Sequence, residues 1–411
     1  MKFLLFRAVF FVIFVCVLVL IVGFARGYRL DFTQQKLSST GILVASSAPD
    51  GAKILVNGVL KGATNSNISL KPGNYDVEIA QDGYLSWKKK LNIKGELVIK
   101  ADALLFPINP TLSPLTSFGV IKAFATTTHE KVILFSETGD PLKDGIYLID
   151  NRNNPLARIN GQKLLALTSI FPSGTSLKEA SVEFSPNEKQ MLITFSESKL
   201  PAPTKLVKKP VAITTIKAIY LLSTDEVSLN PFEVTTSVDA VRSAWVTEHV
   251  EVQAKLIETF KKPIVKAAES FKILGFSPDE TKILYVATES ATIGQVIKPA
   301  LIATNQTPEE RTIKPNSVYI YDKKEDKNFK IVDEYDPLTP LFWYVDSQHI
   351  TVRESEGIAI VDYDGSNKRL VYSGPFQPEF VSVTRDGKLL ILTNFNSSTR
   401  SLADVYSVGI Q

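Results

Sequence analysis

A two-part strand pattern that recurs five times constrains this chain more than any other feature. Each copy has a β-rich run followed by a second strand, and turn residues separate the runs, which is typical of consecutive β-strands. The repetition predicts a series of similar small sheets. The first runs lie at 131–137, 189–196, 282–288, 349–354 and 388–395, and the second strands lie at 145–150, 218–223, 317–322, 357–362 and 404–409.

The spacing of the copies matches the blades of a β-propeller. The second strands that begin at Ser317, Gly357 and Asp404 follow one another at the ~40–45-residue period of a propeller blade. The earlier intervals are longer because they hold candidate insertions. We therefore expect a propeller of about five blades over residues 117–411, with insertions near 199–217, 240–268 and 291–316.

A turn upstream of four of the copies supports this interpretation. In its clearest form it reads Phe276-Ser277-Pro278-Asp279, where the aromatic side chain packs on the sheet, proline fixes φ and the carboxylate caps the bend. This segment resembles the TolB-like family of bacterial β-propellers, and the resemblance spans roughly residues 115–411. Glu280 stands where that family has glycine. The resemblance implies a binding or assembly platform, although a shared fold does not establish a shared partner.

Residues 41–106 predict a separate, smaller β domain. Asn57-Gly58 ends one apolar run with a strong hairpin turn. In the segment 75–79, apolar and acidic residues alternate, which places Tyr75, Val77 and Ile79 on one buried face. Strands and tight turns of this kind predict a compact β-sandwich.

The same segment resembles the PEGA domain. The namesake motif appears at 49–52, with Asp50 in place of the usual glutamate, and Asn65 stands where the family has proline. The resemblance implies an accessory module outside the cytoplasm and transfers no catalytic residue. Further matches are the segments 56–58, 62–64, 70–73 and 82–84, together with Trp87.

The N-terminal segment predicts a membrane anchor. After a short tail at 1–7, residues 8–25 are uncharged and mostly apolar, and 18 helical residues at ~1.5 Å each cover about 27 Å, close to the thickness of a bilayer core. Gly23 and Ala25 leave cleavage after Ala25 as an alternative to an uncleaved anchor. The short tail and large body favour export of the body. The absence of cysteine after Cys16 is compatible with that location.

A polar stalk is expected at 26–40 and a proline-bearing linker at 107–116. The expected fold class is therefore all-β with one N-terminal transmembrane helix: a small PEGA-like β-sandwich plus a β-propeller of about five blades with a helical insertion.

Candidate contacts in the small domain are aromatic. Tyr84 and Trp87 form either a platform that stacks on a sugar ring or part of the sandwich core, and the core is the more common use of such residues. The three lysines at 88–90 read mainly as a solvated sheet edge, since lysine protects edges from association.

The insertions supply further candidates. Val241, Trp245, Val252, Leu256 and Phe260 recur at helical spacing, and Pro263 should interrupt that helix. This helix either packs on the propeller flank or docks a partner. The insertion at 199–217 reads as an exposed loop that contacts an anionic polymer or is simply solvated; its candidate contacts are Lys205, Lys208 and Lys209.

Composition excludes several classes of function. A net charge of +3 gives no reason to expect nucleic-acid binding. One cysteine and three histidines in 411 residues exclude a multi-thiolate metal site and make a histidine-rich one improbable. No phosphate loop, nucleophile elbow or zinc-protease motif is present. The segment 362–365 faintly suggests a calcium loop but fits a hairpin turn better.

The sequence therefore predicts a single-pass, membrane-anchored binding or scaffolding protein of a bacterial cell envelope. The propeller would present loops to an envelope protein or a glycan, and no catalytic residue, cofactor or metal is expected. Two alternatives stay open: an envelope carbohydrate-active enzyme with paired carboxylates at the propeller mouth, and a purely structural spacer.

Overall fold

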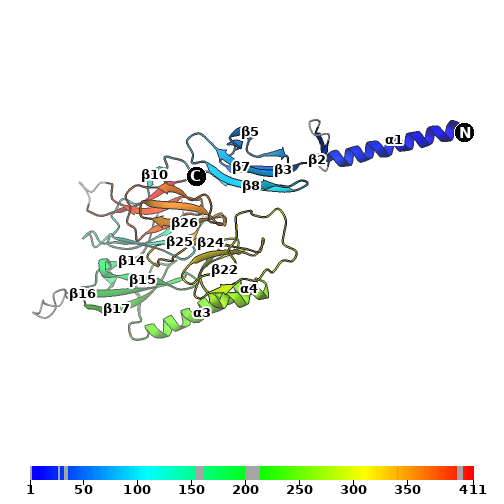
Figure 1. The fold of residues 1–411 in the computed structure, drawn as a ribbon. Coiled ribbons are helices and arrows are strands. Elements are labelled where there is room, and N and C mark those ends of the chain that lie inside the picture. Colours follow the sequence, from blue (N-terminus) through cyan, green and yellow to red (C-terminus); the bar gives the residue numbers. More distant parts are fainter. Residues whose placement is uncertain are drawn as a thin grey trace, which may run out of the picture.

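The computed structural model describes residues 2–25, 28–31, 36–152, 162–199, 213–339, 341–395 and 401–411. Its order is an apolar helix, a small pair of sheets and a larger ring of sheets (Figure 1). Apart from α1 (Lys2–Ala25), the longest helix is an insertion in the ring. The expected all-β fold with one N-terminal helix is confirmed.

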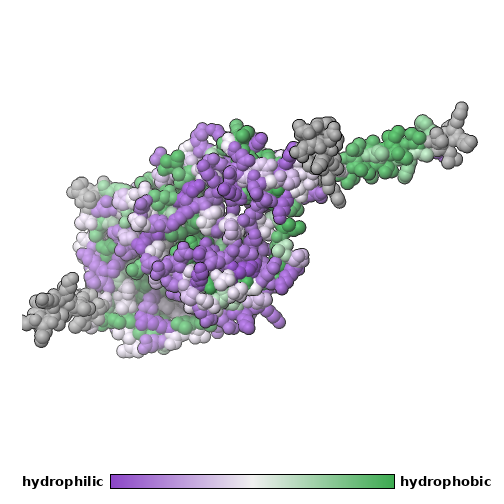
Figure 2. Space-filling model, in the orientation of Figure 1, coloured by the Kyte–Doolittle hydropathy of each residue, from purple (hydrophilic) through white to green (hydrophobic). Residues whose placement is uncertain are grey.

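Helix α1 is apolar on every side. It holds an 18-residue stretch, Phe6–Gly23, that is long and apolar enough to cross a membrane, and that stretch is exposed. Figure 2 shows it as a hydrophobic rod extending from a largely hydrophilic body. Within the segment 26–40, expected as a stalk, β1 (Tyr28–Asp31) pairs with β2 (Lys36–Ser39) in an antiparallel ladder.

The small domain is a sandwich of two sheets. One has the order β6-β3-β9 and the other β5-β4-β7-β8. Asn57 and Gly58 both adopt positive φ in the hairpin turn, as expected from their tolerance of that region. Val77 and Ile79 are buried in a core that Tyr75 partly covers. The strands are β3 (Gly41–Ala48), β4 (Lys53–Val56), β5 (Val59–Ala63), β6 (Ser66–Leu70), β7 (Gly73–Ala80), β8 (Trp87–Ile93) and β9 (Val98–Leu104).

Five four-stranded sheets form the propeller. Blades 1 to 4 have the orders β11-β12-β13-β14, β15-β16-β17-β18, β19-β20-β23-β24 and β25-β26-β27-β28. The expected strands occupy the second and third places of each blade. These strands are β12 (Lys131–Ser136), β13 (Gly145–Asp150), β16 (Gln190–Lys199), β17 (Ile213–Ser223), β20 (Lys282–Ala287), β23 (Val318–Asp322), β26 (His349–Glu354), β27 (Gly357–Asp362), β30 (Leu389–Thr393) and β31 (Asp404–Gly409).

Blade 5 joins the two ends of the propeller. Its order is β10-β31-β30-β29, so β10 (Thr111–Pro114) forms an edge of the last sheet. The segment 107–116, expected as a linker, thus contributes a strand. Pro114 is tolerated because it lies on an edge strand that needs no second partner. This pairing leaves no open blade, which is the usual solution to the edge problem in propellers.

The first strands of the blades lie around the centre of the ring. Trp343 of β25 donates its indole N–H to the carbonyl of Gly275 in β19 at 3.3 Å, and the His129 ring lies 4.0 Å from that of Phe342. The outer strands complete each blade. The inner strands are β11 (Lys122–Ala125), β15 (Ser181–Phe184), β19 (Phe271–Phe276), β25 (Leu341–Trp343) and β29 (Val381–Val383), and the outer ones are β14 (Lys163–Leu167), β18 (Phe232–Glu233), β24 (Lys327–Val332) and β28 (Arg369–Tyr372).

The helical insertion fills the junction between blades 2 and 3. Each other pair of neighbouring blades shares a hydrophobic cluster. Trp245 at the start of α3 (Val238–Glu258) packs instead on blade 2, and Phe260 beyond its end packs on blade 3. The expected interruption at Pro263 occurs, since α3 ends before it and α4 (Lys262–Ala267) begins around it. Val252 departs from the expected buried face because it is exposed, whereas Ile257 is buried.

The two remaining insertions extend existing sheets. The segment 199–217 continues the β16–β17 hairpin, with its tip at 200–212 outside the described residues. The segment 291–316 contains a short antiparallel pair, β21 (Ala291–Thr292) and β22 (Thr312–Ile313). Between these two strands, the chain follows blade 3 to the turn between β23 and β24, where the Arg311 guanidinium lies 3.3 Å from Asp326 Oδ1. Residues 303–306 belong to this loop and lie beside the sandwich.

Candidate functional site

The sandwich packs against the turns of blade 4, and the contact begins as an apolar one. Phe106, directly after the sandwich, is buried in the same cluster as Tyr344 and Ile358 of blade 4. Leu85 of the sandwich covers that cluster. Burying these side chains removes apolar surface from water, which stabilises a fixed arrangement of the two domains.

Polar contacts then fix the register of the two domains. The Trp87 indole N–H donates to Asp362 Oδ2 at 3.2 Å, and the backbone N–H of Lys88 donates to Asn367 Oδ1 at 2.9 Å. The Arg369 guanidinium donates to the carbonyl of Ser86 at 2.8 and 3.1 Å. Because these groups come from both domains, the junction resists sliding as well as separation.

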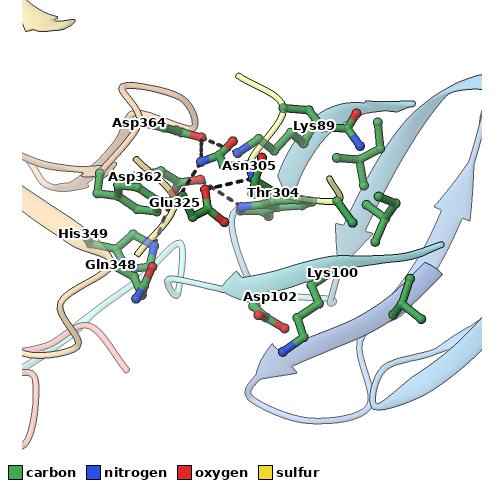
Figure 3. A pocket seen from close by; sticks show the side chains of 17 residues that line it. Lys89, Lys100, Asp102, Thr304, Asn305, Glu325, Gln348, His349, Asp362 and Asp364 are labelled. Atoms are coloured by element: carbon green, nitrogen blue, oxygen red, sulfur yellow. Dashed lines mark hydrogen bonds and ion pairs between the residues drawn. The ribbon is translucent and has the colours of Figure 1, made fainter. Parts of the chain in front are cut away.

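A pocket of about 330 Å³ lies at this junction. Figure 3 shows side chains of the sandwich and of the propeller facing each other across it. Its size is at the lower end of the ~300–1,000 Å³ of small-molecule sites. The sandwich lines it with Trp87, Lys89, Leu91, Val98, Ile99, Lys100 and Asp102; the propeller lines it with residues 303–306, Glu325, Gln348, His349, Asp362, Tyr363 and Asp364.

A buried histidine organises the propeller side of the pocket. His349 begins β26, and its ring nitrogens lie 2.6 Å from Asp346 Oδ2 and 3.3 Å from Asp362 Oδ1. Burial opposes the charged imidazolium, but hydrogen bonds and charges from Asp346 and Asp362 prevail and raise the pKa of His349 to about 10. The imidazolium therefore keeps the Asp362 carboxylate in a position to accept the hydrogen bond from the Trp87 indole N–H.

The neighbouring carboxylates differ in their environments. Burial works to raise the pKa of Asp364, yet the Lys89 ammonium and hydroxyl donors keep it below its usual range. Thr307 and Ser366 donate to this carboxylate at 2.6 Å each. Burial raises the pKa of Glu325, against the backbone N–H of Asn305 that donates to it at 2.9 Å. The pocket thus holds a fully bonded carboxylate beside one that is only partly bonded.

The structure brings only part of the expected candidate set to this site. Trp87 lines the pocket and is also buried in the sandwich core, with 5% of its surface exposed. Tyr84 is partly buried against the same core. Trp245 lies elsewhere, packed on blade 2. Three more candidates, Lys205, Lys208 and Lys209, lie outside the described residues.

Most pocket residues were absent from the sequence-based candidates. Lys100, Thr304, Glu325 and Gln348 come from one sandwich strand and three separate propeller segments. No local motif joins them. The nearest signal was the predicted hairpin at 362–365, which the structure confirms as the turn that follows β27, with Gly365 at positive φ.

The centre of the propeller has a different character. Aromatic and aliphatic residues such as Phe124, Phe184 and Phe342 dominate the five inner strands. Glu183 is the one acid in those strands, and it forms an ion pair with Arg242 of α3 at the propeller flank. The inner strands therefore supply no pair of free carboxylates.

Two departures from the expected PEGA motif contact each other. The Asn65 side-chain amide donates to Asp50 Oδ1 at 2.9 Å. Nearby, the Thr64 hydroxyl accepts from the backbone N–H of Ala52 at 2.9 Å, and the Thr64 N–H donates to the carbonyl of Ala52 at 2.8 Å. The two departures thus form a hydrogen bond that joins two neighbouring turns.

These turns and the sandwich topology agree with a comparison to protein families. Residues 40–109 match the PEGA domain. The expected resemblance is thereby confirmed for the small domain, and its sandwich is called the PEGA domain below. No curated protein matches the chain.

Solved structures similar to the chain include propellers. TolB from Acinetobacter baumannii is 14% identical with a TM-score of 0.23, and the alignment covers 82% of this chain and 60% of that one. An auxiliary nutrient binding protein from Bacteroides thetaiotaomicron is 10% identical with a TM-score of 0.25, covering 87% and 90%. The propeller domain of the Trilobed protease from Pyrococcus furiosus is 12% identical with a TM-score of 0.19, covering 90% and 95%. At these values we draw no inference about ligand or partner.

Proposed function

We propose that this chain is a membrane-tethered, extracytoplasmic binding protein of a bacterial cell envelope. Helix α1 would anchor it, and the PEGA domain would hold the propeller at a fixed orientation. The observation that carries the proposal is the junction pocket, because both domains contribute polar side chains to it. An envelope protein or a glycan would be held there.

The arrangement of α1 supports the tethering part of the proposal. Figure 1 shows α1 leaving on one side of the molecule, while the β16–β17 hairpin extends on the opposite side. A bilayer around α1 would therefore leave that end of the propeller free. The PEGA domain, which lies between them along the chain, would act as the spacer.

Three carboxylates, Asp362, Asp364 and Glu183, are engaged within the protein and support binding rather than hydrolysis. Asp362 and Asp364 are occupied by donors from the protein, and the one acid of the inner strands is paired. A glycosidase needs one free carboxylic acid and one free carboxylate at a suitable separation. The carbohydrate-active enzyme stays an alternative prediction, which hydrolysis of nitrophenyl glycosides above the uncatalysed rate would favour.

Two experiments in native cells test the proposal. Lys61→Cys, at an exposed position on β5, should react with a membrane-impermeant maleimide in intact cells, in a Cys16→Ser background. Labelling only after lysis would contradict the extracytoplasmic location.

A photo-reactive amino acid at Val98, an exposed apolar residue that lines the pocket, tests the binding site. It should capture a defined envelope component, and the same group at exposed Lys90, outside the pocket on β8, should not. Equal capture at both positions, or none at Val98, would contradict binding at the junction.

A further inference from the structure

We propose that the junction pocket binds a single ring of a neutral saccharide, an inference that rests on the proposed binding function. The ligand class follows from the groups that the folded chain leaves unused. Among the described residues, the exposed Lys100 and Gln348 side chains and the partly buried Thr304 hydroxyl make no hydrogen bond to another group of the protein. These side chains line the pocket and offer both donors and acceptors.

Two acids add unused acceptors. Glu325 accepts from Asn305 through one carboxylate oxygen, and its other oxygen has no partner among the described residues. Asp102 likewise uses one oxygen to accept from the Ser46 hydroxyl. A sugar ring presents several hydroxyl groups that donate and accept at once. The mixture of an amide, a hydroxyl, an ammonium and carboxylate oxygens suits that chemistry.

The charges of the pocket argue against an anionic ligand. Lys89 is paired with Asp364, and His349 lies between two carboxylates. The unpaired groups Lys100 and Asp102 have opposite charges and stand two residues apart on β9, so their fields largely cancel at the ligand. Glu325 adds a further negative charge, so an anion would find no excess of positive charge in the pocket.

The remaining wall of the pocket is apolar. The apolar lining residues are the exposed Val98 of the PEGA domain and Ala303 of the propeller insertion, together with Leu91 and Ile99, which are buried in the PEGA core. A pyranose has an apolar C–H face and a polar rim. Figure 3 shows labelled polar side chains of both domains around the pocket. A volume of about 330 Å³ suits one ring better than an extended polymer segment.

The test uses the full chain in a detergent without a sugar headgroup, such as a dodecyl amine oxide, because maltoside detergents would compete. The probes are methyl glycosides of glucose, galactose, mannose and N-acetylglucosamine, and binding is followed by saturation-transfer NMR and calorimetry. At least one glycoside should bind. Gln348→Leu and Lys100→Met should each weaken its affinity by about tenfold or more, the loss of one or two hydrogen bonds.

The matched control is Lys90→Met, which removes an exposed lysine on β8 outside the pocket and should leave the affinity unchanged. Thr304→Val, in the loop of the insertion, removes another polar group of the pocket. It keeps the test valid if Lys100→Met fails to fold. Absence of binding by every glycoside, or equal affinity in the pocket variants and the control, would overturn the proposal.

Other ligand classes are tested in parallel with the dipeptide Ala-Ala and with inorganic sulfate. Binding of either at the pocket without glycoside binding would overturn the saccharide assignment. Capture of an envelope component at Val98 combined with no glycoside binding would remove this inference alone. Failure of both experiments would remove the proposed function as well.

Discussion

Trp87 links the two domains through a single side chain. Its ring is buried in the PEGA core, and its indole N–H reaches Asp362 at 3.2 Å, where His349 also binds. A tryptophan suits this position because it has a large apolar surface and one polar atom that needs a partner. The junction therefore depends on a short chain of groups, Asp346–His349–Asp362–Trp87.

This chain predicts a pH-dependent junction. The pKa of His349 is raised from its ordinary value of 6.5 to about 10, so its stabilising charge is present in full below pH 6.5 and is lost as the pH rises through 10. The free energy of unfolding should fall across that window by up to about 1.4 kcal/mol per pH unit. In the His349→Gln variant, this fall in the free energy of unfolding should be absent. Denaturant titrations followed by tryptophan fluorescence measure the free energy of unfolding of both proteins.

The control is His249→Gln, at an exposed position on α3. It should keep the pH dependence of the native chain. If His349→Gln and the native chain lost stability equally between pH 6.5 and 10, the charge on His349 would not hold the junction.

At the scale of elements, β10 decides whether the ring is closed. Ser113 of β10 lies opposite Ser407 of β31 in the ladder. Cysteines at both positions should therefore form a disulfide in the folded protein, since directly opposed residues in a sheet are close enough for one. We expect oxidised Ser113→Cys/Ser407→Cys, in a Cys16→Ser background, to migrate as a cross-linked species on non-reducing gels and to unfold at higher denaturant concentration.

The control places the second cysteine in the same blade but at its other edge. Ser382 lies on β29, two strands away from β31. The pair Ser113→Cys/Ser382→Cys should not cross-link in the folded chain. Equal cross-linking of both pairs would show that β10 does not hold its place on β31.

The strand pairs within blades were predictable because their signals are local. Three strands have the same first and last residues in the sequence pattern and in the structure: Gly145–Asp150, Gly357–Asp362 and Asp404–Gly409. Strand β10 was missed because the prolines of the segment 107–116 read as a linker and its partner strand lies at the other end of the chain. Exposure of Val252 was missed because helical spacing gives the period of a face but not the residues that its neighbours cover.

The pocket was beyond local prediction for a related reason. Its unused polar groups, such as Lys100, Thr304 and Gln348, become neighbours only when the PEGA domain docks on blade 4. Each of them alone reads as an ordinary surface residue. Trp87 was found from the sequence because an aromatic residue after a turn stands out, but its bond to Asp362 spans 275 positions.

On the scale of the whole molecule, the two domains should behave as one body. Apolar packing by Phe106 and the Arg369 bonds to Ser86 both cross the junction. Spin labels at Lys61→Cys on the PEGA domain and Lys255→Cys on α3, with Cys16→Ser, should give one narrow distance distribution in pulsed EPR. Arg369→Met combined with Lys89→Met should broaden it, because polar contacts that hold the orientation are removed.

The exposed Lys90→Met change serves as the control and should leave the distribution narrow. A broad distribution in the otherwise native chain would contradict a rigid junction. It would also contradict a preformed pocket, since both domains line it.

The parallel pairing of β3 with β9 has a mechanical consequence for a tethered protein. The chain enters the PEGA domain through β3 from the side of α1 and leaves through β9 toward the propeller, and Ile42 to Ala48 pair with Val98 to Leu104. Under the proposed tethering, tension between the bilayer and a load on the propeller would pull the start of β3 and the end of β9 in opposite directions. The hydrogen bonds between these two strands would then bear the force simultaneously, in shear, instead of breaking one after another.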